Sequence, residues 1–397
     1  MVQSIRAARR ALPENVRTLS WVSFANDLAS ELLYPILPLF LTVTLGAPVA
    51  ALGVIEGLAE GAAVGLRGVA GWLSDRWGGR RVAWVRAGYT LTALSRPLLA
   101  GAQGWGWVLA ARLGDKAGKA VRTAPRDALI RASTPRELVG SAFGYQRAFD
   151  TAGAVVGPLV AVALLASGVS LRTVLWVAAL AGALTLVLLM RIHEAPAVEE
   201  RKETVEATER LPRGFWWALG VWFVFCLGNS SDTFVLLRGR NLGLSFTLVV
   251  LAYAVYNLVY SSLSWPLGAL SDRVPRTWVL GGGLAVFALV YLGFAVAPGS
   301  WAVWPLLAVY GTYVAATEGV ARAWVSDFAP QRALGTAYGV FAAASGAGLL
   351  VASVVAGVLW SSVSPKAPFV LGAASATVAL GLLLVTSRRV RTARSPA

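Results

Sequence analysis

Side chains that bind soft metal ions are almost absent from this sequence. Its 397 residues include a single histidine, a single cysteine and two methionines. A disulfide needs two cysteines and a soft-metal site needs several sulfur or imidazole ligands, so the composition excludes both. His193 lies in a polar stretch, which excludes a catalytic site that needs a histidine inside an apolar segment. Cys226 lies in an apolar run, where a lone cysteine usually acts as a small hydrophobic residue.

Charged side chains are also scarce. Only 14% of the residues are charged and 57% are hydrophobic, whereas soluble domains carry roughly a quarter charged residues. The apolar runs approach the ~20 residues with which a helix crosses a bilayer core. They lack the alternation of a barrel strand, and a helix satisfies its own backbone polar groups in lipid. We therefore expect an all-α membrane protein without enzyme activity.

The apolar runs predict twelve transmembrane helices in two sets of six. The first set is expected at 17–44, 49–73, 81–101, 104–130, 140–166 and 170–191, and the second at 214–238, 245–270, 276–297, 300–328, 332–360 and 365–386. The polar stretch 192–213 between the sets is expected to be a linker. Residues 1–191 then form an N-terminal half, and 214–397 form a C-terminal half that ends in a basic tail.

Basic residues indicate how the chain crosses the membrane. They cluster at the N-terminus, at Arg76–Arg81, at Arg131–Arg136, at Arg273–Arg276 and at Arg388–Arg394, all on one side of the predicted spans. Because such residues accumulate on the cytoplasmic side, both termini and the linker are expected in the cytoplasm of a bacterium or archaeon, with a multi-pass chain in the inner membrane. The net charge of +15 then implies contact with anionic lipid and no nucleic-acid partner.

The two halves carry related motifs. Gly71, Asp75 and Arg76 after the second span recur as Gly268, Asp272 and Arg273 after the eighth, and the set Pro135, Gly140 and Gly144 recurs as Pro330, Gly335 and Gly339. Duplicated six-helix halves place a substrate site at their interface near the membrane midplane.

The loop after the second span also carries a family signature. It follows the pattern G-x-x-x-D-R-x-G-x-R-R, and its matching residues are Gly71, Asp75, Arg76, Gly78, Arg80 and Arg81. The chain therefore resembles the major facilitator superfamily over essentially its whole length. The resemblance implies a monomeric transporter of small molecules that works by alternating access. It also implies that this loop, together with the shorter copy at Asp272 and Arg273, latches the halves together on the cytoplasmic face.

The fifth span contains a second family feature. Gly153, Gly157 and Pro158 resemble the G-x-x-x-G-P motif of exporters that run as proton antiporters. The alternative is ordinary close packing of helices through small residues.

The fourth span has a charged face. On a helical wheel one arc carries Arg112, Asp115, Lys116, Lys119, Arg122 and Arg126. The segment from Asp115 to Asp127 also resembles a subgroup of uncharacterised facilitator-type efflux proteins. Unpaired charges cannot face lipid, so we expect Arg112, Asp115, Lys116 and Lys119 to line a cavity. For Arg122, Arg126 and Asp127 the alternative is structural pairing near the cytoplasmic end.

Three carboxylates are candidates for carrying a proton. Asp27 and Glu31 lie four residues apart on the first span, and Asp150 opens the small-residue stripe of the fifth. Two nearby carboxylates repel each other when both are ionised, and burial disfavours the charged form, so either Asp27 or Glu31 could bind a proton near neutral pH. The alternative is a fixed ion pair with a cation of the fourth or fifth span.

Further polar residues are candidates for lining the substrate cavity. They are Tyr34, Glu56, Glu60, Arg147, Asp232, Tyr256, Asn257, Glu318 and Arg322. Opposite charges three or four residues apart on one helix also make structural pairs. Asp232 could serve as a gate or simply lie at a hydrated helix end, and the tyrosines of the eighth span suit an amphipathic ligand.

Three functions fit this pattern. The first is proton-coupled export of a small amphipathic or anionic organic compound, with the proton as coupling ion and no other cofactor or resident metal. The second is proton-linked uptake of an organic anion or a siderophore-like solute. The third is export of a hard metal cation through the carboxylates of Asp27, Glu31, Glu56 and Glu60.

Overall fold

The computed structural model describes residues 12–33, 36–37, 40–47, 49–77, 80–194 and 211–392. Two candidate residues, Tyr34 and Gly78, lie outside these ranges, as does most of the predicted linker. The side chains of Glu56 and Glu60 are also outside the description. The described residues form thirteen α-helices and no strand, which agrees with the all-α class that the composition predicts.

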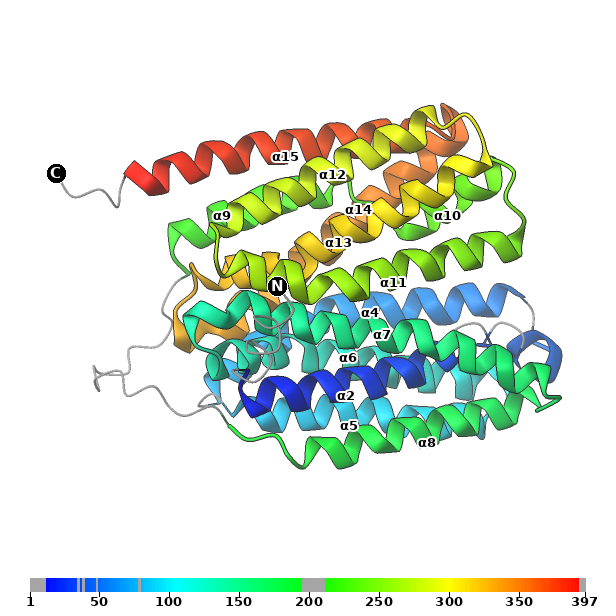
Figure 1. The fold of residues 1–397 in the computed structure, drawn as a ribbon. Coiled ribbons are helices and arrows are strands. Elements are labelled where there is room, and N and C mark those ends of the chain that lie inside the picture. The colour runs from blue at the N-terminus through cyan, green and yellow to red at the C-terminus, as the bar shows by residue number, and fades with distance from the viewer. Residues whose placement is uncertain are drawn as a thin grey trace.

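The N-terminal set of helices forms the lower layer in Figure 1. It consists of α2 (Glu14–Leu33), α4 (Val49–Arg76), α5 (Arg81–Ala100), α6 (Trp105–Ser133), α7 (Val139–Ala166) and α8 (Leu171–Leu189), with a π-helical turn at Phe40–Thr44 between α2 and α4. Within this set α2 packs on α7 and α8, and α6 packs between α4 and α5.

The C-terminal set forms the upper layer of the same view (Figure 1). It consists of α9 (Arg213–Cys226), α10 (Asp232–Asn241), α11 (Phe246–Ser271), α12 (Arg276–Val296), α13 (Val303–Ser326), α14 (Leu334–Ser362) and α15 (Ala367–Thr392). The two sets meet along a seam where α4 packs on α14 and α7 packs on α11. We call the end of the bundle where α2 begins and α15 ends the termini side.

The predicted span 214–238 is wrong in one respect, because the structure interrupts it. α9 ends at Cys226 and α10 begins at Asp232. Gly228 lies in the interruption, where a Cβ would come 3.0 Å from the Cα of Gly372. Asn229 and Ser230 follow, and short polar side chains compete with the helix for backbone hydrogen bonds. α15 continues to Thr392, six residues beyond the end expected for the last span.

Five described helical segments are long and apolar enough to cross a membrane. They are Arg136–Ala166, Leu171–Leu189, Arg276–Val296, Gln331–Ser362 and Ala367–Val385. Large apolar side chains remain exposed on several of them, among them Leu180 at 72% and Val296 at 75%. Such a surface is stable in lipid rather than in water, because the hydrophobic effect would otherwise bury it.

Glycines allow the backbones to touch at the seam on the termini side. A Cβ on Gly71 of α4 would lie 3.0 Å from the Cα of Gly339 in α14. In the second half a Cβ on Gly268 of α11 would lie 2.9 Å from the Cα of Gly144 in α7. These are the repeated glycines of the two halves, so the same backbone contact closes the seam twice.

We predict that Gly268→Val opens the termini side, because its branched side chain has no room against α7. Spin labels at Glu137→Cys and Arg273→Cys, in a chain whose Cys226 is replaced by serine, will report the separation of the halves by pulsed electron paramagnetic resonance. The expected result is a shift of the population toward longer distances.

Gly220→Val is the matched control, because a Cβ at Gly220 meets nothing within 4 Å. A distance distribution that Gly268→Val leaves unchanged would contradict the role given to this contact.

Candidate functional site

Asp75 joins the two halves at the termini side. Its carboxylate accepts hydrogen bonds from the backbone N–H of Gly335 (3.0 Å) and Thr336 (2.5 Å) and from the Thr336 hydroxyl (2.8 Å). Arg81 adds an ion pair at 3.6 Å and donates to the Gln331 carbonyl across the seam. The α4 end is thereby tied to the start of α14.

Asp272 makes the equivalent contact in the second half. It accepts hydrogen bonds from the backbone N–H of Gly140 and Ser141, both at 2.6 Å. Arg276 pairs with Asp272 at 3.4 Å and with Asp327, and it was not among the predicted latch residues. Its signal in the sequence was its position four residues after Asp272.

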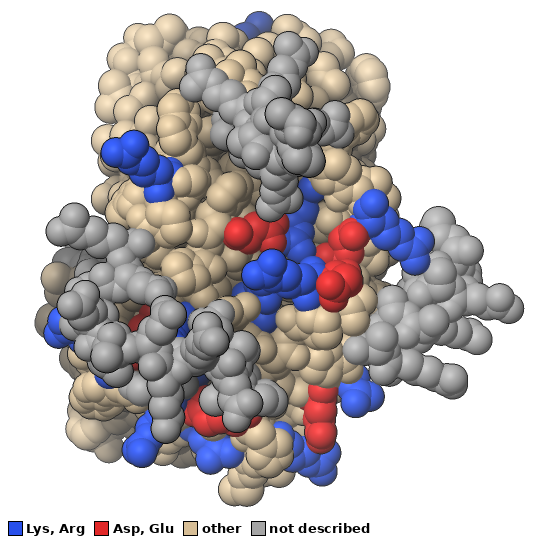
Figure 2. All heavy atoms as spheres, turned by 90° about the vertical axis from the view of Figure 1, so that its left-hand side faces the viewer, with Lys and Arg blue, Asp and Glu red and all other residues tan. Residues whose placement is uncertain are grey.

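The remaining predicted latch arginines lie at the surface. Arg76 stacks over the Trp72 ring at 4.3 Å, and Arg80 and Arg273 are exposed. Figure 2 shows the termini side face on, with acidic and basic side chains close together near the middle of the molecule. This face therefore holds the halves together and carries exposed positive charge.

A network of charged side chains lies deeper in the bundle. Arg147 pairs with Asp150 at 2.9 Å and with Glu318 of the other half at 3.7 Å. Arg322 pairs with Glu318 at 2.8 Å and with Asp127 of the first half at 3.0 Å. The pairs within α7 and α13 confirm the spacing argument, and the contacts between halves join them into one network that crosses the seam twice.

Asp27 extends this network into α2. Its carboxyl group lies close enough to that of Asp150 for the two to interact, and it accepts a hydrogen bond from the side-chain amide of Asn26 at 3.1 Å. Two neighbouring carboxylates repel each other when both are ionised, so the pair is stabilised when one of the two binds a proton. We call Asp27 and Asp150 the carboxyl pair, and such a pair can take up and release a proton.

The glycines of the fifth predicted span bring α7 against this carboxyl pair. A Cβ on Gly153 would lie 3.2 Å from the Cβ of Asp27, and one on Gly157 would lie 2.7 Å from the Cβ of Glu31. Pro158 follows inside α7 without ending the helix. The small-residue motif thus provides close packing, and it does so at the height of the two acidic residues of α2.

Most cations on the charged face of α6 have partners. Arg112 pairs with Asp115 at 3.2 Å and buried Arg126 pairs with Asp127 at 2.9 Å. Arg122 donates to the Thr92 hydroxyl and lies 4.3 Å from the centre of the Tyr89 ring. The contacts of Arg122, Arg126 and Asp127 are the structural pairing that was the alternative for these three residues.

Two lysines complete the α6 face. Lys119 is exposed, and its charge acts on both Asp27 and Glu31. Lys116 also interacts within the protein. Because an exposed charged side chain is costly in lipid, we expect water to reach the part of the bundle around Lys119.

Sequence reasoning missed Arg96 of α5. Its side chain is 2% exposed and donates to the Asn26 carbonyl oxygen and side-chain oxygen, both at 2.8 Å, and to the Ser30 hydroxyl. Gly182 of α8 leaves room for it. Arg96 therefore fixes the Asn26 amide that donates to Asp27. The signal was an arginine within an apolar span, with no opposite charge one helical turn away.

The second half contributes a separate polar group. Asp232, the first residue of α10, accepts hydrogen bonds from the hydroxyls of Tyr310 (2.7 Å) and Tyr256 (3.3 Å). Asn257 instead donates to the backbone carbonyl of Tyr253 on its own helix. Asp232 thus lies at an internal break and not at the hydrated end of a span.

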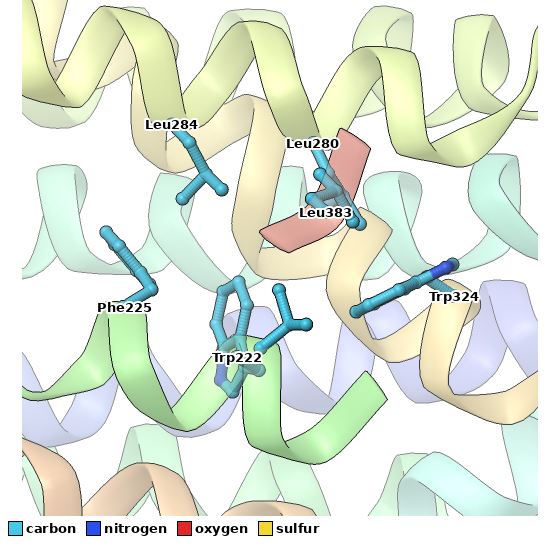
Figure 3. A pocket seen from close by; sticks show the side chains of 7 residues that line it. Trp222, Phe225, Leu280, Leu284, Trp324 and Leu383 are labelled. Atoms are coloured by element: carbon cyan, nitrogen blue, oxygen red, sulfur yellow. The ribbon is translucent and has the colours of Figure 1, made fainter. Parts of the chain in front are cut away.

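A small hollow lies inside the second half, away from these polar groups. It has a volume of about 10 Å³, which is at most the space for one water molecule. Figure 3 shows its apolar lining, including Trp222 and Phe225 of α9, Leu284 of α12 and Trp324 of α13. Its size and lining make it a packing defect. Within the described residues no group of three or more His, Cys, Asp or Glu side chains is arranged to hold a metal ion.

Comparisons with known proteins match the whole length of the chain. Residues 19–238 and 233–397 match the family model described as Major Facilitator Superfamily. An uncharacterised MFS-type transporter of Methanocaldococcus jannaschii is 35% identical over 385 residues, which cover 95% of each chain.

Solved structures share the fold. The human organic anion transporter MFSD10 superimposes with a TM-score of 0.77 at 15% identity, covering 95% of this chain and 99% of its own. The Escherichia coli fucose:proton symporter FucP gives a TM-score of 0.77 at 14% identity, covering 94% and 98%. At these identities the likeness concerns the fold alone.

We predict that Asp75→Asn weakens closure of the termini side without unfolding the protein. The variant keeps one oxygen acceptor but loses the charge, and a hydrogen bond to a charged group contributes about 1.5–3 kcal/mol. Hydrogen–deuterium exchange at the amides of Gly335 and Thr336 is expected to speed up by about tenfold or more.

Asp327→Asn is the control, since Asp327 pairs with Arg276 inside one half. Unchanged exchange at Gly335 and Thr336 in Asp75→Asn would be incompatible with this contact holding the halves together.

Proposed function

Because the chain belongs to the major facilitator superfamily, whose members are membrane transporters, we propose that it exports a small amphipathic organic compound in exchange for protons. Two halves that rock about a central site expose that site to one side of the membrane and then to the other. In this proposal the termini side faces the cytoplasm, because arginines such as Arg80 and Arg273 are exposed there.

The carboxyl pair of Asp27 and Asp150 carries the proposal. Arg147 lies between Asp150 of its own half and Glu318 of the other. When the carboxyl pair releases its proton it gains a negative charge, and Asp150 then competes more strongly with Glu318 for Arg147. Proton binding thereby changes a contact between the halves, which is what coupling requires. Glu31, on the same face of α2 and near Lys119, is the third carboxylate of this route.

The contacts of α6 favour an amphipathic substrate over a strongly anionic one. Arg112, Arg122 and Arg126 all hold partners within the protein, so little of the positive charge on this face is left to attract an anion. The fucose symporter and the organic anion transporter that share the fold carry different solutes, and a common scaffold with different sites is the rule for such folds.

We predict that Asp27→Asn and Asp150→Asn lower substrate-driven proton flux by about tenfold or more, because each removes a member of the carboxyl pair. The measurement is the internal pH of proteoliposomes of known orientation while amphipathic cations, anions and neutral compounds are added. Wild-type protein is expected to move protons opposite to the compound.

Glu137→Gln is the control, since Glu137 is an exposed residue of the termini side. Proton movement in the same direction as the compound would contradict the proposed exchange and would indicate proton-linked uptake instead. Normal flux in both Asp27→Asn and Asp150→Asn would remove the carboxyl pair from the mechanism.

A further inference from the structure

Asp232 lies where a membrane helix is interrupted. α9 stops at Cys226, and α10 starts again at Asp232 with its N-terminus inside the protein. The end of an interrupted helix inside a transporter is a common place for a bound solute, and the positive N-terminal end of α10 helps to hold the carboxylate of Asp232 in its first turn. Both oxygens of Asp232 accept tyrosine hydroxyls, from Tyr310 and Tyr256, so the carboxylate is held in a fixed orientation.

No cation compensates the charge of Asp232 among the described residues. Other carboxylates of the charged network have arginine partners, as Glu318 has in Arg322 and Asp127 has in Arg126. Asp232 takes part in none of the described ion pairs, and the charged group acting on it is another carboxylate, Glu318. The ionised form of a carboxyl group is costly at this depth, so a bound positive charge would stabilise that form strongly.

Aromatic rings lie beside this carboxylate. We call Asp232 with Tyr253, Tyr256, Tyr291, Tyr310 and Tyr313 the tyrosine cluster. The ring of Tyr256 lies 5.3 Å from those of Tyr253 and Tyr310, and Tyr310 lies 5.1 Å from Tyr313, between ring centres. Ring faces attract positive charge, and a cage of them suits a cation with apolar substituents.

One edge of the tyrosine cluster is accessible. Tyr253 is 37% exposed and Asp232 is partly exposed, whereas Tyr310 is 1% exposed. The buried hydroxyl of Tyr291 lies near Ser230 and Tyr310 but makes no hydrogen bond of good geometry. The cluster therefore has a packed floor and an open edge at Asp232 and Tyr253.

We propose that the tyrosine cluster binds the positively charged group of an amphipathic organic cation, such as a substituted ammonium. This inference rests on the proposed export of an amphipathic compound and gives its substrate class. A hard metal ion fits poorly, because it takes about six oxygen ligands and Asp232 is the single carboxylate of the cluster. An anion is repelled by the ionised carboxylate of Asp232.

Binding of tetraphenylphosphonium to the purified full-length protein tests the site, with tetraphenylborate as an anion of nearly the same shape. Wild-type protein is expected to bind the cation saturably and more tightly than the anion. Asp232→Asn is expected to lower the affinity for the cation by about tenfold or more, Tyr310→Phe by several-fold, and Asp232→Glu less than Asp232→Asn.

Tyr145→Phe is the control, since Tyr145 is a buried tyrosine that packs on Phe149 and Trp265 outside the cluster. Thermal unfolding of each variant will show that the fold is kept. Equal binding of cation and anion by wild type, or wild-type affinity in folded Asp232→Asn, overturns the proposal.

The result also separates this site from the proton exchange on which it rests. Loss of cation binding in Asp232→Asn, with no proton flux in wild type driven by any of the tested compounds, supports the site and rejects the exchange. Proton flux driven by neutral or anionic compounds, with no binding of the cation, supports the exchange and overturns the site.

Discussion

A charged side chain in a bilayer finds no partner in the lipid, and the interior of this protein is organised around that constraint. Arg147, Glu318, Arg322 and Asp127 satisfy one another from both halves. The helices that carry them must therefore meet at the seam in one register. Arg96 obeys the same rule within the first half, where it takes its partners from α2.

The seam combines two kinds of contact with different tolerance to movement. At the termini side, glycine pairs bring backbones together, and a small rotation removes that contact. Deeper in the bundle the partners are long arginine side chains, which can follow a carboxylate over several ångströms by changing rotamer. A rocking motion of the halves would therefore break the glycine contacts of the termini side abruptly. The arginines of the deeper network could exchange partners gradually.

The sequence predicted the features that recur in both halves and the ion pairs whose members lie within one helix. The apolar runs predicted the spans, and the duplicated glycines predicted two related halves. The pairs Arg147–Asp150 and Glu318–Arg322 followed from spacing, because their members lie one turn apart. The pairing of Arg322 with Asp127 depends on how α13 faces α6. The spacing of residues along a single helix carries no information about contacts between two helices. The break before Asp232 was missed because apolar residues continue on both sides of Gly228-Asn229-Ser230.

The contacts of Asp75 and Asp272 have a consequence for how the halves separate. Their carboxylates bond the second and third backbone amides of a helix in the opposite half: Gly335 and Thr336 in α14, Gly140 and Ser141 in α7. The residue before each of these helices has no side chain that caps it. Each half therefore supplies the N-cap of the other, at about 1 kcal/mol for each cap. Separation uncaps two helices at once, so entry of water to these amides is part of the opening step itself.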